Sequence, residues 1–290
     1  MREPKGGGLL TNAKSWTVAV LLGACASQMT FASPAGGDVK VAYGWRFEVY
    51  ANNIPAVDNV AVAFDGEVYA TQGLTDGRGT VVRVEKGGPF EVVLADLNHA
   101  NGLYVRGRYL YVSEEIPDGR VLQFDLCGGG RHLLATLRNP EGVDMLPDGD
   151  LIVSEDSVSG RVVRIQRNGT VETLLAGLNR PEGIAVAKNG TVFVAETATG
   201  RILAYRRGEI EVIVHDLDEP DHVAVAADGA LWITEDTPSG RLLRFHNGML
   251  ETVLSGLKAP QGIAFLGDGT VLVAEQDRSR ILAVMRKPSP

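Results

Sequence analysis

The chain repeats one pattern of residues six times between Ile54 and its C-terminus. Each copy opens with Leu or Ile, has an acidic or amide residue four positions later, and continues with two short apolar runs joined by a Gly turn. The opening residue recurs about every 40 residues, at Ile54, Leu97, Leu137, Leu178, Leu217 and Leu257. A period of this length with several short strands per copy is typical of propeller blades and not of a helical solenoid.

The fourth copy shows how each repeat is expected to fold. Residues 183–187 and 191–195 are short apolar runs, and Asn189-Gly190 between them favours a tight hairpin turn. Residues 201–205 and 210–214 supply a third and a fourth strand. Six such antiparallel sheets, packed radially, predict an all-β six-bladed β-propeller of four-stranded blades.

The last copy lacks its fourth strand, because it ends after the third strand at residues 280–284. Residues 45–50 lie before Ile54 in the same register that residues 249–253 have before Leu257. We therefore predict that the N-terminal strand completes the final blade and closes the ring. The propeller is expected to span residues 44–286, followed by a tail at 287–290.

The N-terminus resembles an export signal. Arg2, Lys5 and Lys14 precede an apolar run at 18–26 that is too short to span a bilayer, and small residues follow it. Residues 1–32 are interpreted as a signal peptide and 33–43 as a linker.

Two ways of processing this signal remain open. Cleavage after Ala32 would give a soluble product, which is slightly favoured. Alternatively, Leu22-Gly-Ala-Cys25 resembles a lipobox, and a lipid on Cys25 would then be the protein's contact with a membrane. In either case we expect a periplasmic or secreted protein.

Charge and cysteine content limit the partners that are expected. The net charge is −8, which argues against nucleic acid and favours neutral or cationic small molecules. Cys127 is the single cysteine of the predicted propeller, so no disulfide is expected within it. The sequence leaves the oligomeric state open, and a monomer is the simplest expectation.

A Glu and an Arg recur together in five of the six copies. The Glu ends the second strand and the Arg begins the third. In the first copy Gln72 and Thr80 replace both charges at once, as expected for an ion pair. We interpret these residues as structural pairs, and not as a catalytic or metal-binding array. The pairs are Glu114–Arg120, Glu155–Arg161, Glu196–Arg201, Glu235–Arg241 and Glu275–Arg280.

A second set of polar residues begins the innermost strands. These strands start on one side of a propeller, so the side chains are expected to meet at one mouth of the central channel. They are Asp58, Asn101, Glu141, Glu182, Asp221 and Gln261, and none has an obvious Arg partner in its copy. Clustered carboxylates and amides favour a hard divalent ion; Ca²⁺ fits best and Mg²⁺ or another divalent ion less well. Alternatively, they only face channel water and cap the strands.

The repeats resemble those of six-bladed propellers of the senescence marker protein/gluconolactonase and strictosidine-synthase-like superfamily, and more loosely NHL repeats. The resemblance covers about residues 44–286. Calcium-dependent hydrolases of that superfamily hold the ion with Glu, Asn and Asp at this inner-strand position. By this resemblance Asp58 takes the place of a first-blade Glu, and Asn101 matches an amide ligand.

The same resemblance places Glu182 where an Asn is usual and Asp221 at a fifth-blade Asp, with Glu141 and Gln261 as additional oxygen donors. The chain departs from the family in a more acidic ring. It also departs at His222, which follows Asp221 where the family prefers Gly.

Two histidines are candidate general bases. His222 is predicted to lie near the channel mouth and to activate water against an ester or lactone carbonyl. His99, two residues before Asn101, is the second candidate at the same rim. A polar channel filler is the alternative interpretation of His222.

Three functions are consistent with these residues. The first is an exported Ca²⁺-dependent hydrolase of lactones or esters. The second is a non-enzymatic NHL-type propeller that binds a ligand or protein at its rim. The third is an enzyme similar to virginiamycin B lyase, suggested by residues 228–235. Because function depends on the site and not on the fold, the sequence leaves all three open.

Overall fold

A computed structural model describes residues 39–288. The predicted signal segment, with Cys25 and the cleavage site after Ala32, lies outside the described residues. Within residues 39–288, no helix is long and apolar enough to cross a membrane.

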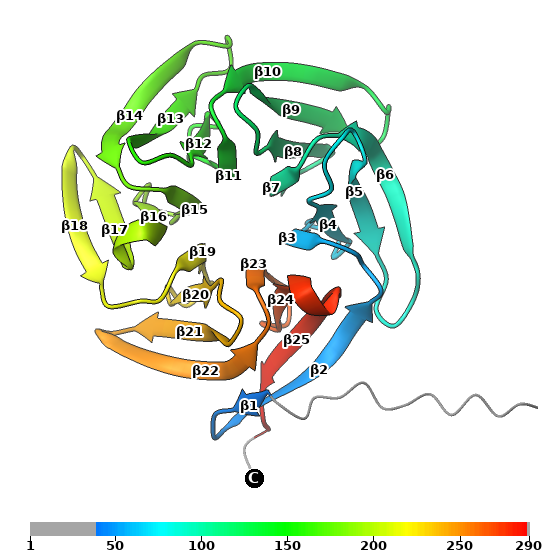
Figure 1. Ribbon diagram of the computed structural model, residues 1–290, viewed down its shortest axis with the longest axis vertical. Helices are drawn as coiled ribbons and strands as arrows, with labels where there is room; N and C mark the ends of the chain where they lie inside the picture. The colour runs from blue at the N-terminus through cyan, green and yellow to red at the C-terminus, as the bar shows by residue number, and fades with distance from the viewer. Residues whose placement is uncertain (1–38, 289–290) are drawn as a thin grey trace, which may run out of the picture. The chain divides into compact units, whose positions relative to one another are not determined.

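The described residues form six antiparallel sheets around a centre, and the prediction of a six-bladed β-propeller is confirmed (Figure 1). Blade 1 holds β3 (Val57–Val62), β4 (Val68–Gln72), β5 (Gly79–Val84) and β6 (Phe90–Leu97). Blade 2 holds β7 (Ala100–Arg106), β8 (Tyr109–Glu114), β9 (Gly119–Asp125) and β10 (Arg131–Leu137). Blade 3 holds β11 (Pro140–Met145), β12 (Leu151–Glu155), β13 (Gly160–Ile165) and β14 (Val171–Leu178).

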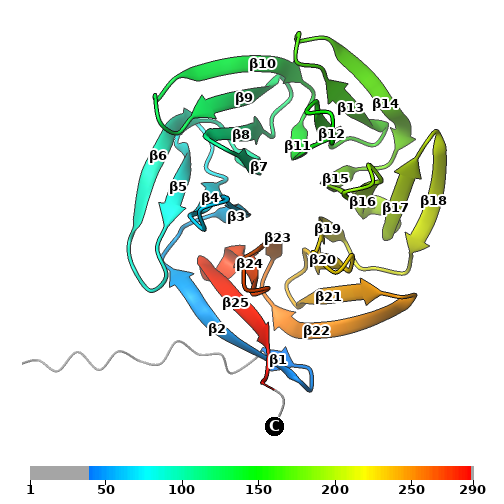
Figure 2. The same ribbon diagram turned by 180° about the vertical axis from the view of Figure 1, so that it is seen from behind.

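Blade 4 holds β15 (Pro181–Val186), β16 (Val192–Glu196), β17 (Arg201–Arg206) and β18 (Glu209–Val214), with the 3-10 turn η1 (Thr197–Thr199) after β16. Blade 5 holds β19 (Pro220–Val225), β20 (Leu231–Glu235), β21 (Gly240–His246) and β22 (Met249–Leu257). Blade 6 holds β23 (Pro260–Phe265), β24 (Val271–Glu275) and β25 (Arg280–Arg286), with η2 (Gln276–Arg278) after β24. The first strand of every blade faces the centre in both views (Figures 1 and 2).

The N-terminal strand closes the ring, as predicted. β2 (Trp45–Asn52) pairs antiparallel with β25 and supplies the fourth strand of blade 6. A short strand that the sequence did not indicate, β1 (Lys40–Val41), adds a fifth strand to blade 5 by pairing with β22. Part of the segment interpreted as a linker is therefore sheet.

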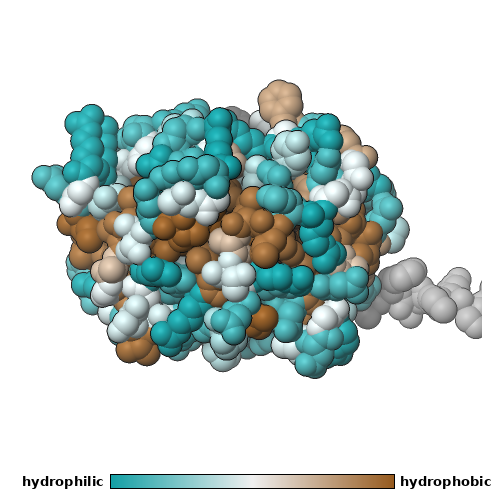
Figure 3. All heavy atoms as spheres, turned by 90° about the horizontal axis from the view of Figure 1, so that it is seen from above, coloured by the Kyte–Doolittle hydropathy of each residue, from teal (hydrophilic) through white to brown (hydrophobic). Residues whose placement is uncertain are grey.

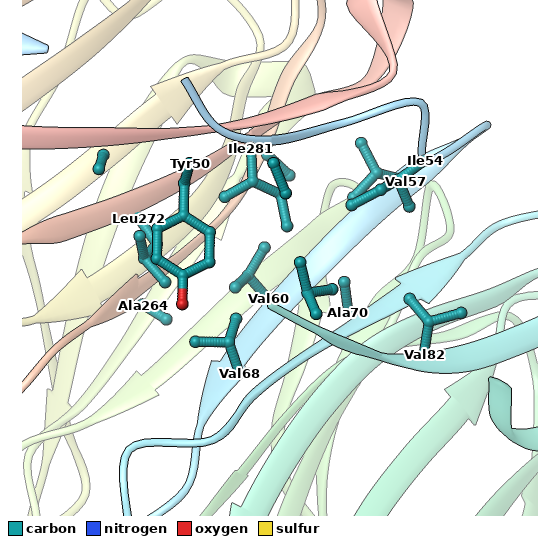
Figure 4. Packing of buried hydrophobic residues seen from close by; sticks show 14 residues of the cluster. Tyr50, Ile54, Val57, Val60, Val68, Ala70, Val82, Ala264, Leu272 and Ile281 are labelled. Carbon is teal, nitrogen blue, oxygen red and sulfur yellow. The ribbon is translucent and has the colours of Figure 1, made fainter. Parts of the chain in front are cut away.

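Apolar side chains between neighbouring blades hold the ring together. At the closing seam, Tyr50 and Ile54 pack with Val60 and Val68 of blade 1 and Leu272 of blade 6 (Figure 4). Five similar clusters fill the other spaces between the sheets. On the side of the ring shown in Figure 3, apolar atoms form a band at mid-height between polar rims.

The five predicted Glu–Arg pairs are present as ion pairs, one in each of blades 2 to 6. In blade 1 the Thr80 hydroxyl donates instead to Gln72 Oε1 at 2.7 Å. Each Glu also accepts the backbone N–H of the residue after the opening Leu, as Glu155 does from Arg138 at 3.0 Å. Each ion pair thus fixes a corner of its blade, where the turn between the second and third strands meets the turn that enters the blade from the previous one.

Blade 1 shows how this corner is kept without charge, and it suggests a rescue experiment. Arg161→Thr leaves Glu155, whose side chain is 5% exposed, as a buried charge without its partner. We expect a loss of about 3 kcal/mol in the free energy of unfolding. The double variant Glu155→Gln/Arg161→Thr copies the pair of blade 1 and should recover most of that loss in urea denaturation. A double variant no more stable than Arg161→Thr alone would show that the pairing is not what matters.

Candidate metal centre at the channel mouth

In each blade, the residue two positions after the opening Leu or Ile has the left-handed backbone conformation. It lies in the turn that leads into the inner strand at the mouth of the channel. These residues have φ between 45° and 53°. The carbonyl of each accepts the N–H of the residue that follows the second strand, at 2.8–3.0 Å. They are Ala56, His99, Asn139, Arg180, Glu219 and Ala259. The turn therefore places the start of the first strand beside the end of the second.

A β-bulge then directs the predicted ligands toward the centre. In blade 4, Pro181 pairs with Glu196 and Ile184 with Val194, so that two residues oppose one. The same irregularity occurs at the start of all six inner strands. Bulges re-aim side chains in this way beside functional sites. The six residues so placed form the first ring and are all buried: Asp58, Asn101, Glu141, Glu182, Asp221 and Gln261.

A second ring, which the sequence reasoning missed, lies against the first. It consists of the residues directly after the second strands: Gly73, Glu115, Asp156, Thr197, Asp236 and Gln276. Asn101 Nδ2 donates to Glu115 Oε2 at 3.0 Å, and the Thr197 hydroxyl donates to Glu182 Oε2 at 2.6 Å. The signal for this ring was available, because the residue after the Glu of each of the five structural pairs is polar.

The mouth is strongly acidic, and two of its carboxylates have no partner among residues 39–288. Burial raises the pKa of Glu182 to about 8, and raises the pKa values of Asp58, Glu141 and Asp221 well above their usual range. Neighbouring carboxylates, Glu182 and Glu115 among them, raise the pKa values of those three further. The Glu141 and Asp221 carboxylates have no hydrogen-bond or ion-pair partner in the part of the chain that the structure describes.

One acid of the first ring does have an Arg partner, contrary to the prediction. Arg180 Nη2 lies 2.5 Å from Glu182 Oε1, and Arg180 Nε lies 3.2 Å from Asp156 Oδ1. The pair escaped the sequence reasoning because Arg180 is only two residues from Glu182. On a regular strand two such side chains would lie about 7 Å apart, and the left-handed turn brings them together.

His99 lies at the rim beside both rings. Its Nδ1 is 3.0 Å from the Glu115 carbonyl oxygen and 3.3 Å from Glu115 Oε2. Gly73 lies closely against both residues, because a Cβ there would lie 3.3 Å from Asp58 Oδ2 and 3.3 Å from His99 Cδ2. The structure therefore brings a histidine and a carboxylate of the second ring together at the acidic mouth.

His222 is placed differently from its prediction. Its Nδ1 lies 3.5 Å from Asn59 Nδ2, within a channel cavity of about 260 Å³ lined mainly by apolar residues of the inner strands. Burial lowers the pKa of His222 to about 4, so its imidazole is neutral at pH 7. Successive side chains of a strand point to opposite sides, and His222 therefore contacts Asn59 and not Asp221.

The donor set fits a hard divalent cation. Carboxylate oxygens of Glu141, Glu182 and Asp221 lie within 4.8 Å of one another, and all three residues are buried. The remaining members of the first ring add carboxylate and amide oxygens. Such a set suits Ca²⁺, which takes about six to eight oxygen ligands in flexible geometry.

Comparison with known proteins agrees with the repeat and the fold. The NHL repeat model matches residues 178–205, which is the fourth copy of the repeat. Comparison with curated protein sequences gave no match.

Among solved structures, the chain is similar to a gluconolactonase from Xanthomonas campestris, with 16% identity over 86% of this chain and 95% of that one and a TM-score of 0.73. It is similar to a calcium-binding protein, regucalcin, from Agrobacterium tumefaciens, with 16% identity over 85% and 97% and a TM-score of 0.67. It is also similar to virginiamycin B lyase from Staphylococcus aureus, with 15% identity over 86% and 100% and a TM-score of 0.61. The chain is thus a six-bladed β-propeller that carries an NHL repeat and shares its fold with gluconolactonases and regucalcin.

Proposed function

We propose that the protein is an exported hydrolase of lactones or esters that depends on a divalent cation, Ca²⁺ in the first place. One observation carries the proposal: the buried, unpaired carboxylates of Glu141 and Asp221 share a mouth with the His99–Glu115 pair. A cation site beside a histidine base is the arrangement that metal-assisted hydrolysis requires. The fold shared with gluconolactonases supports the proposal at the level of architecture.

The first ring would hold the cation, through Asp58, Asn101, Glu141, Glu182, Asp221 and Gln261. A bound divalent ion would supply Lewis-acid polarisation of the substrate carbonyl. The other functional groups belong to the chain itself. With Nδ1 of His99 protonated and donating to the Glu115 carbonyl oxygen 3.0 Å away, Nε2 would be left to accept a proton from water. The Glu115 carboxylate, 3.3 Å from His99 Nδ1, would orient the imidazole.

The charge of the mouth indicates the class of substrate. Seven carboxylates of the two rings influence one another's ionisation, and Arg180 is the guanidinium among them. Anionic substrates would be repelled, so we infer neutral or cationic lactones and esters.

Replacing His99 separates this mechanism from its alternatives. His99→Ala is expected to lower kcat/KM by about 10²- to 10⁴-fold, measured with a panel of neutral lactones and aryl esters, while the Ca²⁺ content by elemental analysis stays unchanged. His132→Ala, on the exposed strand β10, is the matched control and should retain full activity.

Two other outcomes would redirect the proposal. If His222→Ala loses activity while His99→Ala remains active, the general base is His222 in the channel and not His99. A purified protein without bound metal or turnover would favour the non-enzymatic, ligand-binding propeller.

A further inference from the structure

Two groups of three carboxylates overlap at the mouth. Glu141, Glu182 and Asp221 form one group, and Glu115, Glu141 and Asp156 form the other. Within each group the ligand oxygens lie within 4.8 Å of one another. Glu141 belongs to both groups, so they meet at one side chain.

Glu141 is the buried carboxylate that both groups share. It is 6% exposed, and no hydrogen bond or ion pair of its carboxylate is formed with residues 39–288. Arg180 contacts one other member of each group, Glu182 in one and Asp156 in the other, and makes no direct contact with Glu141. In the same blade as Glu141, Asn139 Oδ1 is buried without a hydrogen-bond partner. Buried oxygens left in this state are costly unless a cation or water satisfies them.

The charge balance points in the same direction. With all seven carboxylates of the two rings ionised, as ligands of a cation would be, and with His99 neutral, the Arg180 guanidinium leaves six negative charges unbalanced. One divalent ion would leave four of these charges in a buried setting, whereas two ions would leave two. Carboxylates shared between two ions about 3.5–4 Å apart are the usual ligands of two-metal sites.

We propose that the mouth binds two divalent cations with Glu141 as their shared ligand. One ion lies at Glu141, Glu182 and Asp221, and the second at Glu141, Glu115 and Asp156. The second site rests on the proposed function, because it shares Glu141 with the ion of the hydrolase. It assigns a metal-binding role to two second-ring residues, Glu115 and Asp156.

The test is the stoichiometry of Ca²⁺ binding to the full chain, measured by titration calorimetry after chelation and by elemental analysis. The unchanged protein should bind two Ca²⁺ per chain. Asp156→Asn and Asp221→Asn should each bind one, and Glu141→Gln should weaken both sites by at least about tenfold. Asp236→Asn is the matched control, because it lies in the second ring but outside both groups, and it should still bind two.

The outcomes distinguish the second site from the first. One ion per chain, lost in Asp221→Asn and kept in Asp156→Asn, would overturn the second site and leave the proposed hydrolase intact. No ion in the unchanged protein would overturn both. Circular dichroism of each variant in excess chelator shows that lost binding is not lost folding.

Discussion

A chain that begins at Asn53, and so lacks β2, is expected to lose cooperative folding. Without β2 the strand β25 has a free edge, and the seam between blades 6 and 1 loses Tyr50 and Ala51. Trp45, which packs edge-to-face on Trp232 of blade 5 with ring centroids 5.2 Å apart, is lost as well. Burying one large aromatic side chain removes about 150–250 Å² from water, or about 4–6 kcal/mol.

Two aromatics alone therefore match the whole stability of an ordinary domain, about 5–15 kcal/mol. Thermal unfolding followed by circular dichroism should show no transition for this chain. A chain that begins at Val39 is the control and should melt like the full protein. Addition of a peptide of residues 44–53 to the shortened chain should restore part of the transition. A sharp transition without the peptide would show that the ring closes by another route.

The second large effect concerns the cation-free protein, whose stability should fall as pH rises from about 4.5 to about 8. The window follows from Glu182, whose pKa is raised from 4.5 to about 8. A carboxyl with a raised pKa binds its proton more tightly in the folded than in the unfolded state. Its stabilising effect is present below the unfolded pKa and is lost as pH rises through the folded one. Each such group costs up to about 1.4 kcal/mol per pH unit in this range.

The pKa values of three more carboxyls, those of Asp58, Glu141 and Asp221, are raised in the same direction. The combined loss in the free energy of unfolding should therefore reach several kcal/mol. In chelator, the melting temperature should be clearly lower at pH 8 than at pH 5. Saturating Ca²⁺ should remove the slope, because a cation stabilises the ionised form. At a hundredfold excess over its Kd, it adds about 2.7 kcal/mol. Glu182→Gln should flatten the slope in chelator. A melting temperature independent of pH in chelator would contradict the assignment.

The sequence predicted the features that repeat. The apolar runs and Gly turns indicated the four strands of each blade, and the register of residues 45–50 indicated the closing strand. Glu114 and Arg120 were recognisable as a pair because Gln72 and Thr80 lose both charges together. The convergence of Asp58, Glu141, Glu182 and Asp221 also followed, since equivalent positions of a propeller meet around its axis.

The features that were missed depend on backbone geometry within one blade. Glu115 and Asp156 lie next to the first ring only because left-handed residues fold the two strand ends together. The same turn brings Arg180 to Glu182 and His99 to Glu115. His222 was misplaced because its neighbour Asp221 was taken as a guide to its direction, whereas a strand alternates its faces.

The closing strand has a consequence for how the protein is made. Trp45 of β2 pairs with Arg286 of β25. β2 leaves the ribosome before the other strands of blade 6, and it cannot form this pairing until β25 has been synthesised. At about 5–20 residues per second this delay is on the order of 10 seconds or longer. Throughout synthesis the nascent ring stays open at one seam, with apolar residues of blade 1 and strand β2 uncovered. The seam between blades 6 and 1 is therefore the last apolar surface of the ring to be buried.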